Sequence, residues 1–366
     1  MENNSTNSKC PNCGSNLEYD AKINRLKCVS CDSSFEVESL GTGKLDEEEQ
    51  DYEAMLEKMK STHLKKATVA SLNCKNCGAN LNHNENTTST VCPFCGSSHI
   101  IETNLEEEII PISGIVPFGI NKTDCNSYFH NWIKGKFFAP NKFKNAKYEI
   151  DLYPVYLPFW TFDMECYTRY HAKRGDYEYR WVEKRDADGN VRREREREIR
   201  WSYRSGSCTN SFDDVMILGS ENHNNRYYIN KVSRFNFERM EKFNSQFLIG
   251  YPSEKISLPL EEGFKQAQAA VQPKIRQTIE WDVGGDECRI LSCSTEYSDV
   301  TFKQVLVPIY NGIYSYNGKQ YNFVVNGQTA KFAGGYPTSW VKIFAVIAAI
   351  IIFMATIGIL FIVIFE

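Results

Sequence analysis

The longest apolar run of the chain lies near its C-terminal end. Ile343 to Phe365 is 23 consecutive residues without a charged side chain. A helix rises about 1.5 Å per residue, so this run spans roughly 34 Å and can cross a hydrocarbon core of about 30 Å. A helix in a soluble core would show a polar face, and this run has none. The pattern predicts one transmembrane helix over residues 341–365.

The residues around this run predict its orientation. Lys331 and Lys342 precede it and only Glu366 follows, so the positive-inside rule places the bulk of the chain in the cytoplasm. The first nine residues are polar, which argues against a secretory signal. We expect a tail-anchored, single-pass protein of the cell membrane whose C-terminus lies across the membrane.

From residue 105 to 337 the pattern alternates between amphipathic helices and aromatic-rich strands. A helix is expected from Thr123 or Asp124 to Pro140, and another from Pro259 to about Thr278, with a distortion at Pro273. The turn sequence at 186–190 lies between two strand-like runs and predicts an antiparallel hairpin. Asn-Gly pairs at 311–312, 317–318 and 326–327 predict further turns. This segment is expected to form a mixed α+β domain.

Two weaker patterns complete the predicted elements. Leu157-Pro158-Phe159-Trp160 is echoed by Val307-Pro308-Ile309-Tyr310, which hints that two halves share a strand-entry motif. Residues 45–66 run from acidic to basic, as suits a helix dipole, and carry a short apolar stripe. This linker helix is expected to be a solvated spacer, or else to dock weakly on a ribbon or a partner.

Eight cysteines form the strongest motif of the chain. Two units of the form C-x2-C-x14-C-x2-C lie at a constant offset of 64, and CPNCGSNL in the first matches CKNCGANL in the second. In a reducing compartment this spacing indicates metal ligands rather than disulfides. The expected ligands are Cys10, Cys13, Cys28 and Cys31 in one site, and Cys74, Cys77, Cys92 and Cys95 in the other.

Four thiolates in two knuckles close a tetrahedral shell, which predicts a structural site without an open position for a substrate. The expected cofactor is Zn²⁺, two ions per chain, with iron as the rival because it accepts the same ligands. A ribbon of about 30 residues cannot bury an adequate core alone, so the metal must stabilise its fold. The other five cysteines lack knuckle spacing and are expected to be ordinary thiols.

The charge pattern separates the function classes. The net charge is −4, and residues 1–36 contain four Lys or Arg against five Asp or Glu, which disfavours nucleic-acid binding by the ribbons. Residues 192–200 read RREREREIR and as a strand put Arg193, Arg195 and Arg197 on one face. The favoured interpretation is a solvated strand with cross-strand charge pairs or an exposed helix with i,i+4 pairs, and contact of a basic face with anionic lipid is the alternative. No catalytic constellation is recognisable, so no enzymatic activity is expected.

Together these patterns predict a multidomain α+β protein with five parts. They are a first zinc ribbon at 1–38, a helical linker at 39–71, a second ribbon at 72–103, a cytoplasmic α+β domain at 105–337 and the transmembrane helix at 341–365.

The chain also resembles a known family over nearly its whole length. The resemblance rests on the paired ribbons, the terminal span and short central motifs: Pro158-Phe159-Trp160-Thr161-Phe162-Asp163, and Val325-Asn326-Gly327-Gln328-Thr329 with Gly334 and Pro337. The family is the bacterial TFIIB-type zinc-ribbon membrane proteins, which include the YdjG-like proteins of phage-shock-type operons and are sometimes mislabelled primosomal or helicase-like. Ala330 and Gly335-Tyr336 depart from its late motif, where a glycine and an arginine-like pair are expected.

The resemblance implies an adaptor in an envelope-stress response that works with flotillin-like or PspA-like partners at the lipid bilayer. The residues themselves favour a non-enzymatic, membrane-bound interaction protein, because closed metal sites and free sheet edges offer surfaces rather than chemistry. Partners are expected to use apolar knuckle surface such as Val29, Pro93 and Phe94. The alternative is a membrane-tethered, zinc-ribbon nucleic-acid-binding protein of replication or transcription.

Overall fold

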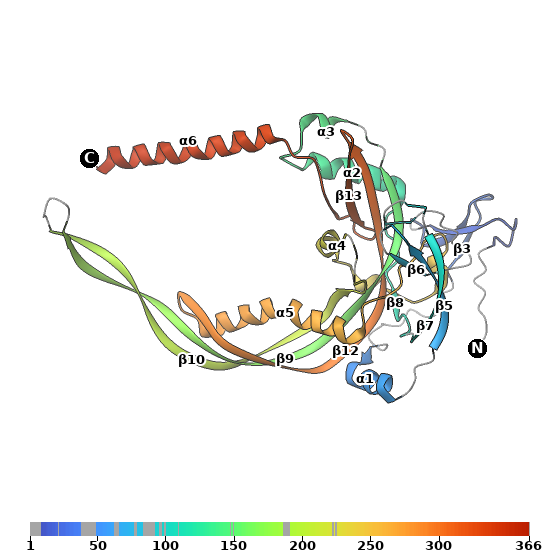
Figure 1. The fold of residues 1–366 in the computed structure, drawn as a ribbon, viewed down its shortest axis with the longest axis horizontal. Coiled ribbons are helices and arrows are strands. Elements are labelled where there is room, and N and C mark those ends of the chain that lie inside the picture. Colours follow the sequence, from blue (N-terminus) through green and yellow to red (C-terminus); the bar gives the residue numbers. More distant parts are fainter. Residues whose placement is uncertain are drawn as a thin grey trace.

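The computed structural model describes residues 9–20, 22–37, 49–61, 66–76, 79–82, 92–94, 97–98, 100–108, 110–146, 148, 150–185, 191–221, 223 and 225–365. Within these ranges the chain is a mixed α+β protein with antiparallel sheets, as the sequence predicted (Figure 1).

Two small sheets lie in the N-terminal third. Strands β1 (Leu17–Asp20), β2 (Arg25–Cys28) and β3 (Ser34–Glu36) form the first. Strands β5 (Lys66–Cys74), β6 (Asn80–Asn82) and β7 (Ile100–Glu108) form the second, in the order β6-β5-β7. Because β5 begins at Lys66 and β7 runs to Glu108, this sheet extends beyond both ends of the predicted second ribbon.

The large sheet has the main strand order β10-β9-β12-β13-β14. These strands are β9 (Asp151–Arg185), β10 (Val191–Leu218), β12 (Glu287–Tyr316), β13 (Lys319–Asn326) and β14 (Phe332–Gly334). Three short strands join this sheet: β4 (Gln50–Asp51), β8 (Gly114–Ile115) and β11 (Glu241–Lys242). Strands β9, β10 and β12 leave the body as a long twisted ribbon (Figure 1).

Six helices accompany the sheets in the described part of the chain. They are α1 (Tyr52–Ser61), α2 (Lys122–Lys134), α3 (Asn141–Asn145), α4 (Arg226–Val232), α5 (Leu260–Val283) and α6 (Trp340–Phe365). Short 3-10 helices cover Phe237–Arg239 and Ser245–Leu248. Helix α2 begins after the Asn121 cap rather than at Thr123 or Asp124, and Pro140 caps α3 instead of ending α2.

Helix α5 covers one face of the proximal ribbon. It buries Phe264, Ala267, Val271 and further apolar residues against Phe162 and the even-numbered residues that follow it on β9. Pro273 lies inside this helix without ending it, and the helix ends at Gly284, whose φ of +63° is costly for a residue with a side chain. The helix is therefore longer than the predicted span of 259–278.

The echoed motifs lie opposite each other in the sheet. Leu157 pairs with Val307 across β9 and β12. Trp160 Nε1 donates to Leu258 O at 3.0 Å, just before α5, and Tyr310 Oη donates to Ile120 O at 2.9 Å, just before α2. The echo is therefore a real structural correspondence.

Backbone contacts extend this correspondence. Gly219 N donates to Pro158 O at 2.8 Å, and Gly327 N donates to Pro308 O at 2.8 Å. Each glycine carbonyl then accepts two consecutive amides: residues 257 and 258 donate to Gly219 O, and residues 119 and 120 donate to Gly327 O. The contacts among α2, β12 and β13 therefore match those among α5, β9 and β10, and a local pseudo-two-fold symmetry relates the two sets.

The predicted hairpin and the Asn317-Gly318 turn are present, whereas Asn311-Gly312 does not form a turn. The predicted hairpin is present, with Arg185 paired to Val191, and its strands are far longer than expected. Asn317 and Gly318 form the turn between β12 and β13 with φ of +50° and +73°. Gly312 instead lies within β12, where it pairs with Phe323 on β13. Glycine is required there because an added Cβ would be 2.0 Å from the Phe323 ring.

The linker helix is not a solvated spacer. Tyr52 is buried, and Met55, Leu56 and Met59 pack beside it on the α5 side of the large sheet. Gln50 and Asp51 pair with β12 immediately before the helix. The apolar stripe thus docks on the α+β domain itself, because that sheet supplies an apolar surface for it.

Candidate metal centre

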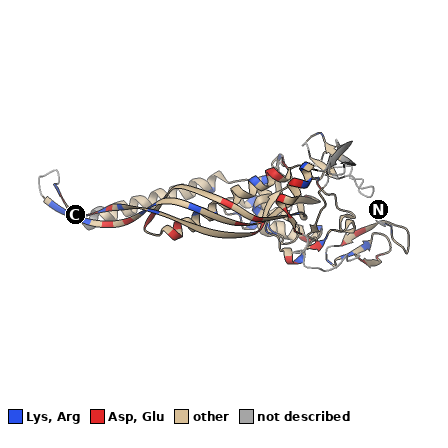
Figure 2. Ribbon diagram, turned by 90° about the horizontal axis from the view of Figure 1, so that it is seen from below, with Lys and Arg blue, Asp and Glu red and all other residues tan. Residues whose placement is uncertain are grey.

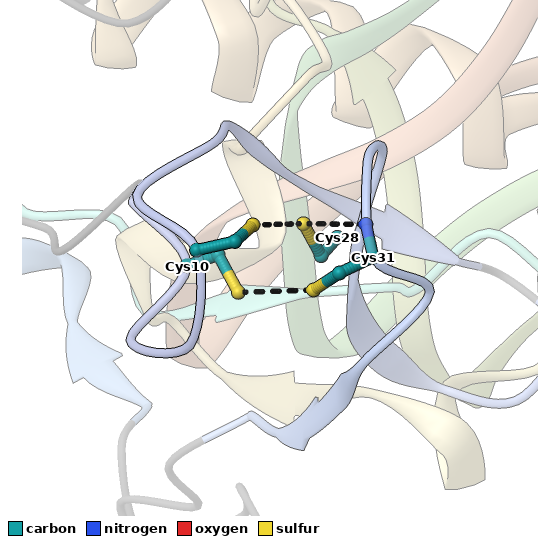
Figure 3. Close-up of side chains that lie close together, drawn as sticks. Cys10, Cys28 and Cys31 are labelled. Atoms are coloured by element: carbon teal, nitrogen blue, oxygen red, sulfur yellow. Dashed lines mark hydrogen bonds between the residues drawn. The ribbon is translucent and has the colours of Figure 1, made fainter.

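Four cysteine sulfurs meet in the first small sheet. Cys10 Sγ lies 3.6 Å from Cys31 Sγ (Figure 3). Cys13 Sγ lies 3.5 Å from Cys28 Sγ. All four sulfurs lie within 4.8 Å of one another. A tetrahedral shell with metal–sulfur bonds of about 2.3 Å places its sulfurs about 3.8 Å apart. The cluster could therefore hold one metal ion in a closed thiolate shell.

The local sequence explains why these sulfurs converge. Cys10 N donates to Ser15 O and Cys28 N donates to Ser33 O, so each knuckle closes on itself. The amides of Ser30 and Cys31 approach Cys28 Sγ at 3.4 and 3.5 Å, as thiolate ligands of a metal commonly require. Gly14 has a φ of +72°, which fits the tight turn after the first knuckle.

This cysteine module packs on the α+β domain. Its sheet buries Leu17, Tyr19 and Leu26 in the same cluster as Phe247 and neighbouring residues. Tyr19 N donates to Ile249 O at 3.2 Å, and the Tyr19 ring meets the Phe247 ring edge-on at 5.4 Å. A metal ion held by these cysteines would therefore stabilise the same strands as the domain packing does.

The second cysteine set is described in part. Cys74 and Cys92 are buried, whereas Cys77 and Cys95 lie outside the described residues. Cys74 N donates to Ala79 O at 2.9 Å and Cys92 N donates to Ser97 O at 2.8 Å. These bonds repeat the two knuckle bonds of the first set at the offset of 64 residues.

One surface expectation is wrong at this second set. The sequence predicted that Pro93 and Phe94, with Val29 in the first set, offer exposed apolar knuckle surface. Val29 is exposed, but Phe94 is only 7 % exposed, and its ring meets the His223 ring edge-on at 4.9 Å. The second knuckle buries its apolar residues against the α+β domain and has little left for a partner.

A cluster of charged side chains, separate from the cysteines, was not predicted. Carboxylate oxygens of Asp163, Asp213 and Asp214 lie within 4.8 Å of one another, where the flanking strands β10 and β12 both carry a bulge. Lys303, whose side chain is 5 % exposed, places Nζ 2.8 Å from Glu49 and 3.7 Å from Asp214. The lysine is the cation that these carboxylates already share.

This cluster ties the linker to the sheet. Glu49 accepts from Thr301 Oγ1 at 2.7 Å as well as from Lys303, and the amide of Asp214 donates to Asp163 at 2.6 Å. Burial, with the neighbouring Glu49 carboxylate, raises the pKa of Asp163 to about 7. Asp163 belongs to the central family motif, which was the one available signal for this cluster.

Asp163→Asn is expected to flatten the dependence of stability on pH. The folded pKa of about 7 exceeds the ordinary value of 3.8, so ionising Asp163 costs stability as pH rises through this window, and the cost is complete above it. After a discount for partial exposure, the variant should gain about 1–2 kcal/mol at pH 8 and nothing near pH 4. Urea unfolding across this range is the measurement. An equal gain at both ends would contradict the assignment.

The remaining cysteines fit the expectation of ordinary thiols. Cys125 is fully buried on α2, and burial raises its pKa to about 12. Cys166 is buried beneath α5, and burial raises its pKa to about 11. Protonated, covered thiols of this kind are poor nucleophiles and poor metal ligands.

Helix α6 is long and apolar enough to cross a membrane. Its segment Trp340–Phe361 is 22 residues with a mean hydropathy of 3.0, and no part of its most apolar stretch is covered by the rest of the chain. Figure 1 shows it projecting from the body next to α2 and α3.

The chain is similar to an uncharacterized protein named YdjG from Bacillus subtilis (strain 168). The two are 27 % identical over 346 residues, which cover 92 % of each chain. No family model matches the chain. No solved structure matches it either.

Proposed function

We propose that this chain is a non-enzymatic, membrane-anchored adaptor that recruits partner proteins to the cytoplasmic face of the cell membrane. The observation that carries the proposal is the uncovered α6, because a largely apolar segment of 22 residues exposed to water would be costly and a bilayer removes that cost. The body attached to α6 has the features of an interaction scaffold.

The metal-binding part of the proposal is two structural zinc ions. Zinc is favoured because four thiolates at tetrahedral spacing suit it, although iron accepts the same shell. The second ion is supported by the two knuckle hydrogen bonds that Cys74 and Cys92 share with the first set. Bound zinc would hold both small sheets folded and would leave no position for a substrate.

The polar cluster supports a structural role in the same way. Its buried Lys303 pairs with Glu49 and Asp214, which favours a structural role for these three groups, while Asp213 is exposed at the surface. Glu49 holds the linker on β12 through this lysine. The N-terminal modules, the linker and the large sheet therefore behave as one rigid platform, which is useful for presenting partner surfaces.

The resemblance to TFIIB-type zinc-ribbon membrane proteins gives the proposal its context. It points to an envelope-stress system of the phage-shock type, with flotillin-like or PspA-like partners. Partners are expected to use exposed faces such as the area around Val29, since Phe94 is covered. The competing function is nucleic-acid binding at the membrane, which the near-neutral cysteine modules disfavour.

Affinity purification of the full chain from detergent-solubilised membranes tests the proposal. The full chain should fractionate with membranes and co-purify with a membrane-associated protein. After a high-salt wash, a chain without residues 340–366 should be released from membranes, keep its metal and no longer bring that partner to the membrane. Recovery of the shortened chain with salt-washed membranes, or co-purification of nucleic acid in place of protein, would contradict the proposed function.

A further inference from the structure

The two faces of the distal ribbon differ in chemistry. Its odd-numbered face consists of the odd-numbered residues of β9 from Lys173 to Arg185 and of β10 from Val191 to Tyr203, which pair odd with odd. This face carries five cationic side chains and one carboxylate, a net charge of +4. The even-numbered residues between the same limits carry five of each sign.

The even-numbered face is internally neutralised. Arg200 lies 3.0 Å from Glu178, Arg180 lies 3.4 Å from Glu198, and Lys184 lies 3.3 Å from Glu194. These are the cross-strand charge pairs that the sequence predicted for RREREREIR. Closer to the body, the same face is covered by α5, where Ala172 and Tyr170 are buried.

The odd-numbered face contains the ion pair of Arg193 with Glu183 at 3.2 Å, and it places three further cations over aromatic rings. The guanidinium of Arg195 lies 4.1 Å from the Tyr179 ring centre, and that of Arg197 lies 4.3 Å from the Tyr177 ring centre. Lys173 over Tyr203 and Arg289 over Trp201 continue the row toward the body at 4.8 and 4.3 Å. Neither Arg195 nor Arg197 has a salt bridge within the described part of the chain.

Large aromatic side chains on this face are exposed to solvent. Trp181 is 70 % exposed and Tyr203 is 77 % exposed. Gly175 keeps the row continuous, because a Cβ there would lie 2.8 Å from Ile199 and 3.0 Å from the Trp201 ring. Figure 2 shows basic residues extending along the ribbon away from the body.

We propose that this odd-numbered ribbon face binds the headgroup layer of an anionic membrane. Exposed Trp and Tyr favour the membrane–water interface, and clustered Arg is attracted to acidic lipid headgroups. A single-stranded nucleic acid would also stack on such rings. The bilayer is favoured because α6 brings a membrane to this molecule, so the inference rests on the membrane location in the proposed function.

The arrangement of α6 sets the geometry of this contact. The distal ribbon and α6 extend from the body toward the same end of the molecule (Figure 1). A bilayer crossed by α6 cannot also enclose the ribbon, because ionised side chains on its even face would lose their hydration. The ribbon therefore lies along the headgroups, and α6 turns from it through residues 335–339, which belong to no helix or strand.

Reorienting α6 would break a small set of hydrogen bonds at its first turn. Lys342 Nζ donates to Ala139 O and Asn141 Oδ1 at 2.8 Å each and to Phe137 O at 3.2 Å, and Ser339 N donates to Phe138 O at 2.7 Å. Hydrogen bonds of this kind are readily exchanged for water or lipid headgroups. The ribbon, by contrast, keeps its own pairing in either arrangement.

The test uses the full chain in lipid nanodiscs with 5-fluorotryptophan in place of tryptophan. The Trp181 and Trp340 fluorine resonances are assigned with Trp181→Phe and Trp340→Phe. A spin label attached to the lipid headgroups should broaden the fluorine resonance of Trp340 in every disc. It should broaden Trp181 in discs that contain phosphatidylglycerol, much less in phosphatidylcholine alone, and less again at high salt.

A matched pair of double variants makes the test specific. Arg195→Gln with Arg197→Gln should lower the ratio of lipid-bound to free ribbon by about thirtyfold, since two interfacial cations of about 1 kcal/mol each are lost. Arg180→Gln with Arg200→Gln removes the same charge from the even face and should change that ratio little.

Four outcomes would overturn the inference. Equal losses in both double variants would assign the effect to total charge. Broadening of Trp340 without any change at Trp181 in anionic discs would refute the ribbon contact while leaving the anchor intact, whereas loss of both would refute the membrane anchor itself. A Trp181 response to single-stranded DNA, without a response to anionic lipid, would assign the face to nucleic acid.

Discussion

Cys28→Ser is expected to remove one metal ion per chain and to unfold the first cysteine module. Cys28 is fully buried, and its sulfur accepts two backbone amides besides facing Cys13. A structural zinc supplies apparent folding free energy of order 10 kcal/mol, which a three-cysteine shell largely forfeits. Because Leu17, Tyr19 and Leu26 share a core with Phe247, unfolding of the module should also expose that side of the α+β domain.

Elemental mass spectrometry and hydrogen exchange of residues 17–28 measure this effect. Cys288→Ser is the matched control, since Cys288 is half-buried and lies outside the cysteine clusters. It should leave both the metal content and the exchange rates of the module unchanged. If the Cys28 variant kept its full metal content, the four-cysteine site would be refuted; iron in place of zinc would correct the metal alone.

Lys303→Met is expected to lower the free energy of unfolding by about 3–5 kcal/mol, the cost of leaving buried carboxylates without their cation. Lys303 Nζ bonds to Glu49 at 2.8 Å and lies 3.7 Å from Asp214, and its side chain is 5 % exposed. The methionine would fill the space but could not compensate the charges. The linker, which Glu49 holds on β12, should become susceptible to protease at the same time.

Denaturant unfolding of Lys303→Met should be compared with Lys265→Met. Lys265 makes a salt bridge of 3.4 Å to Glu262, but its side chain is 68 % exposed. An exposed pair contributes about 0–1 kcal/mol, so this control should change stability little. Equal effects in the two variants would show that the Lys303 cluster is not a buried ion network.

The first cysteine cluster could be predicted because its information is local. Two knuckles of fixed spacing bring Cys10, Cys13, Cys28 and Cys31 together through a short sheet, and no distant segment is needed. How the module docks could not be predicted, since Tyr19 meets Phe247 more than two hundred positions away. The same reason explains why Phe94 was expected to be exposed: its cover, His223, is remote in sequence.

The Lys303 cluster escaped prediction because it depends on register. Asp163, Asp214 and Lys303 lie on three strands, and bulges between Phe212 and Val215 and between Ser298 and Thr301 bring them together. A sequence pattern does not reveal the offset between strands that are separated by long connections.

Strand length was the other failure. The hairpin turn at 186–190 was recognisable, yet β9 covers Asp151–Arg185, whereas strands usually have about 3–10 residues. Ala330 shows the opposite case, in which family knowledge was informative: its φ of +58° is a conformation that favours the glycine expected there.

The matched contacts of Trp160 and Tyr310 point to an internal duplication of the chain. One half consists of α2, β9 and β10, the other of α5, β12 and β13, and β9 pairs with β12. Trp160 of the first half bonds to Leu258 just before α5, and Tyr310 of the second half bonds to Ile120 just before α2. This exchange is the arrangement of an isologous dimer, in which each copy presents the same patch to the other. A gene duplication followed by fusion would place both copies in one chain. One half then lengthened its hairpin into the ribbon, while β12 and β13 kept a short turn at Asn317-Gly318. The chain would then be a fused homodimer whose two arms have taken different tasks.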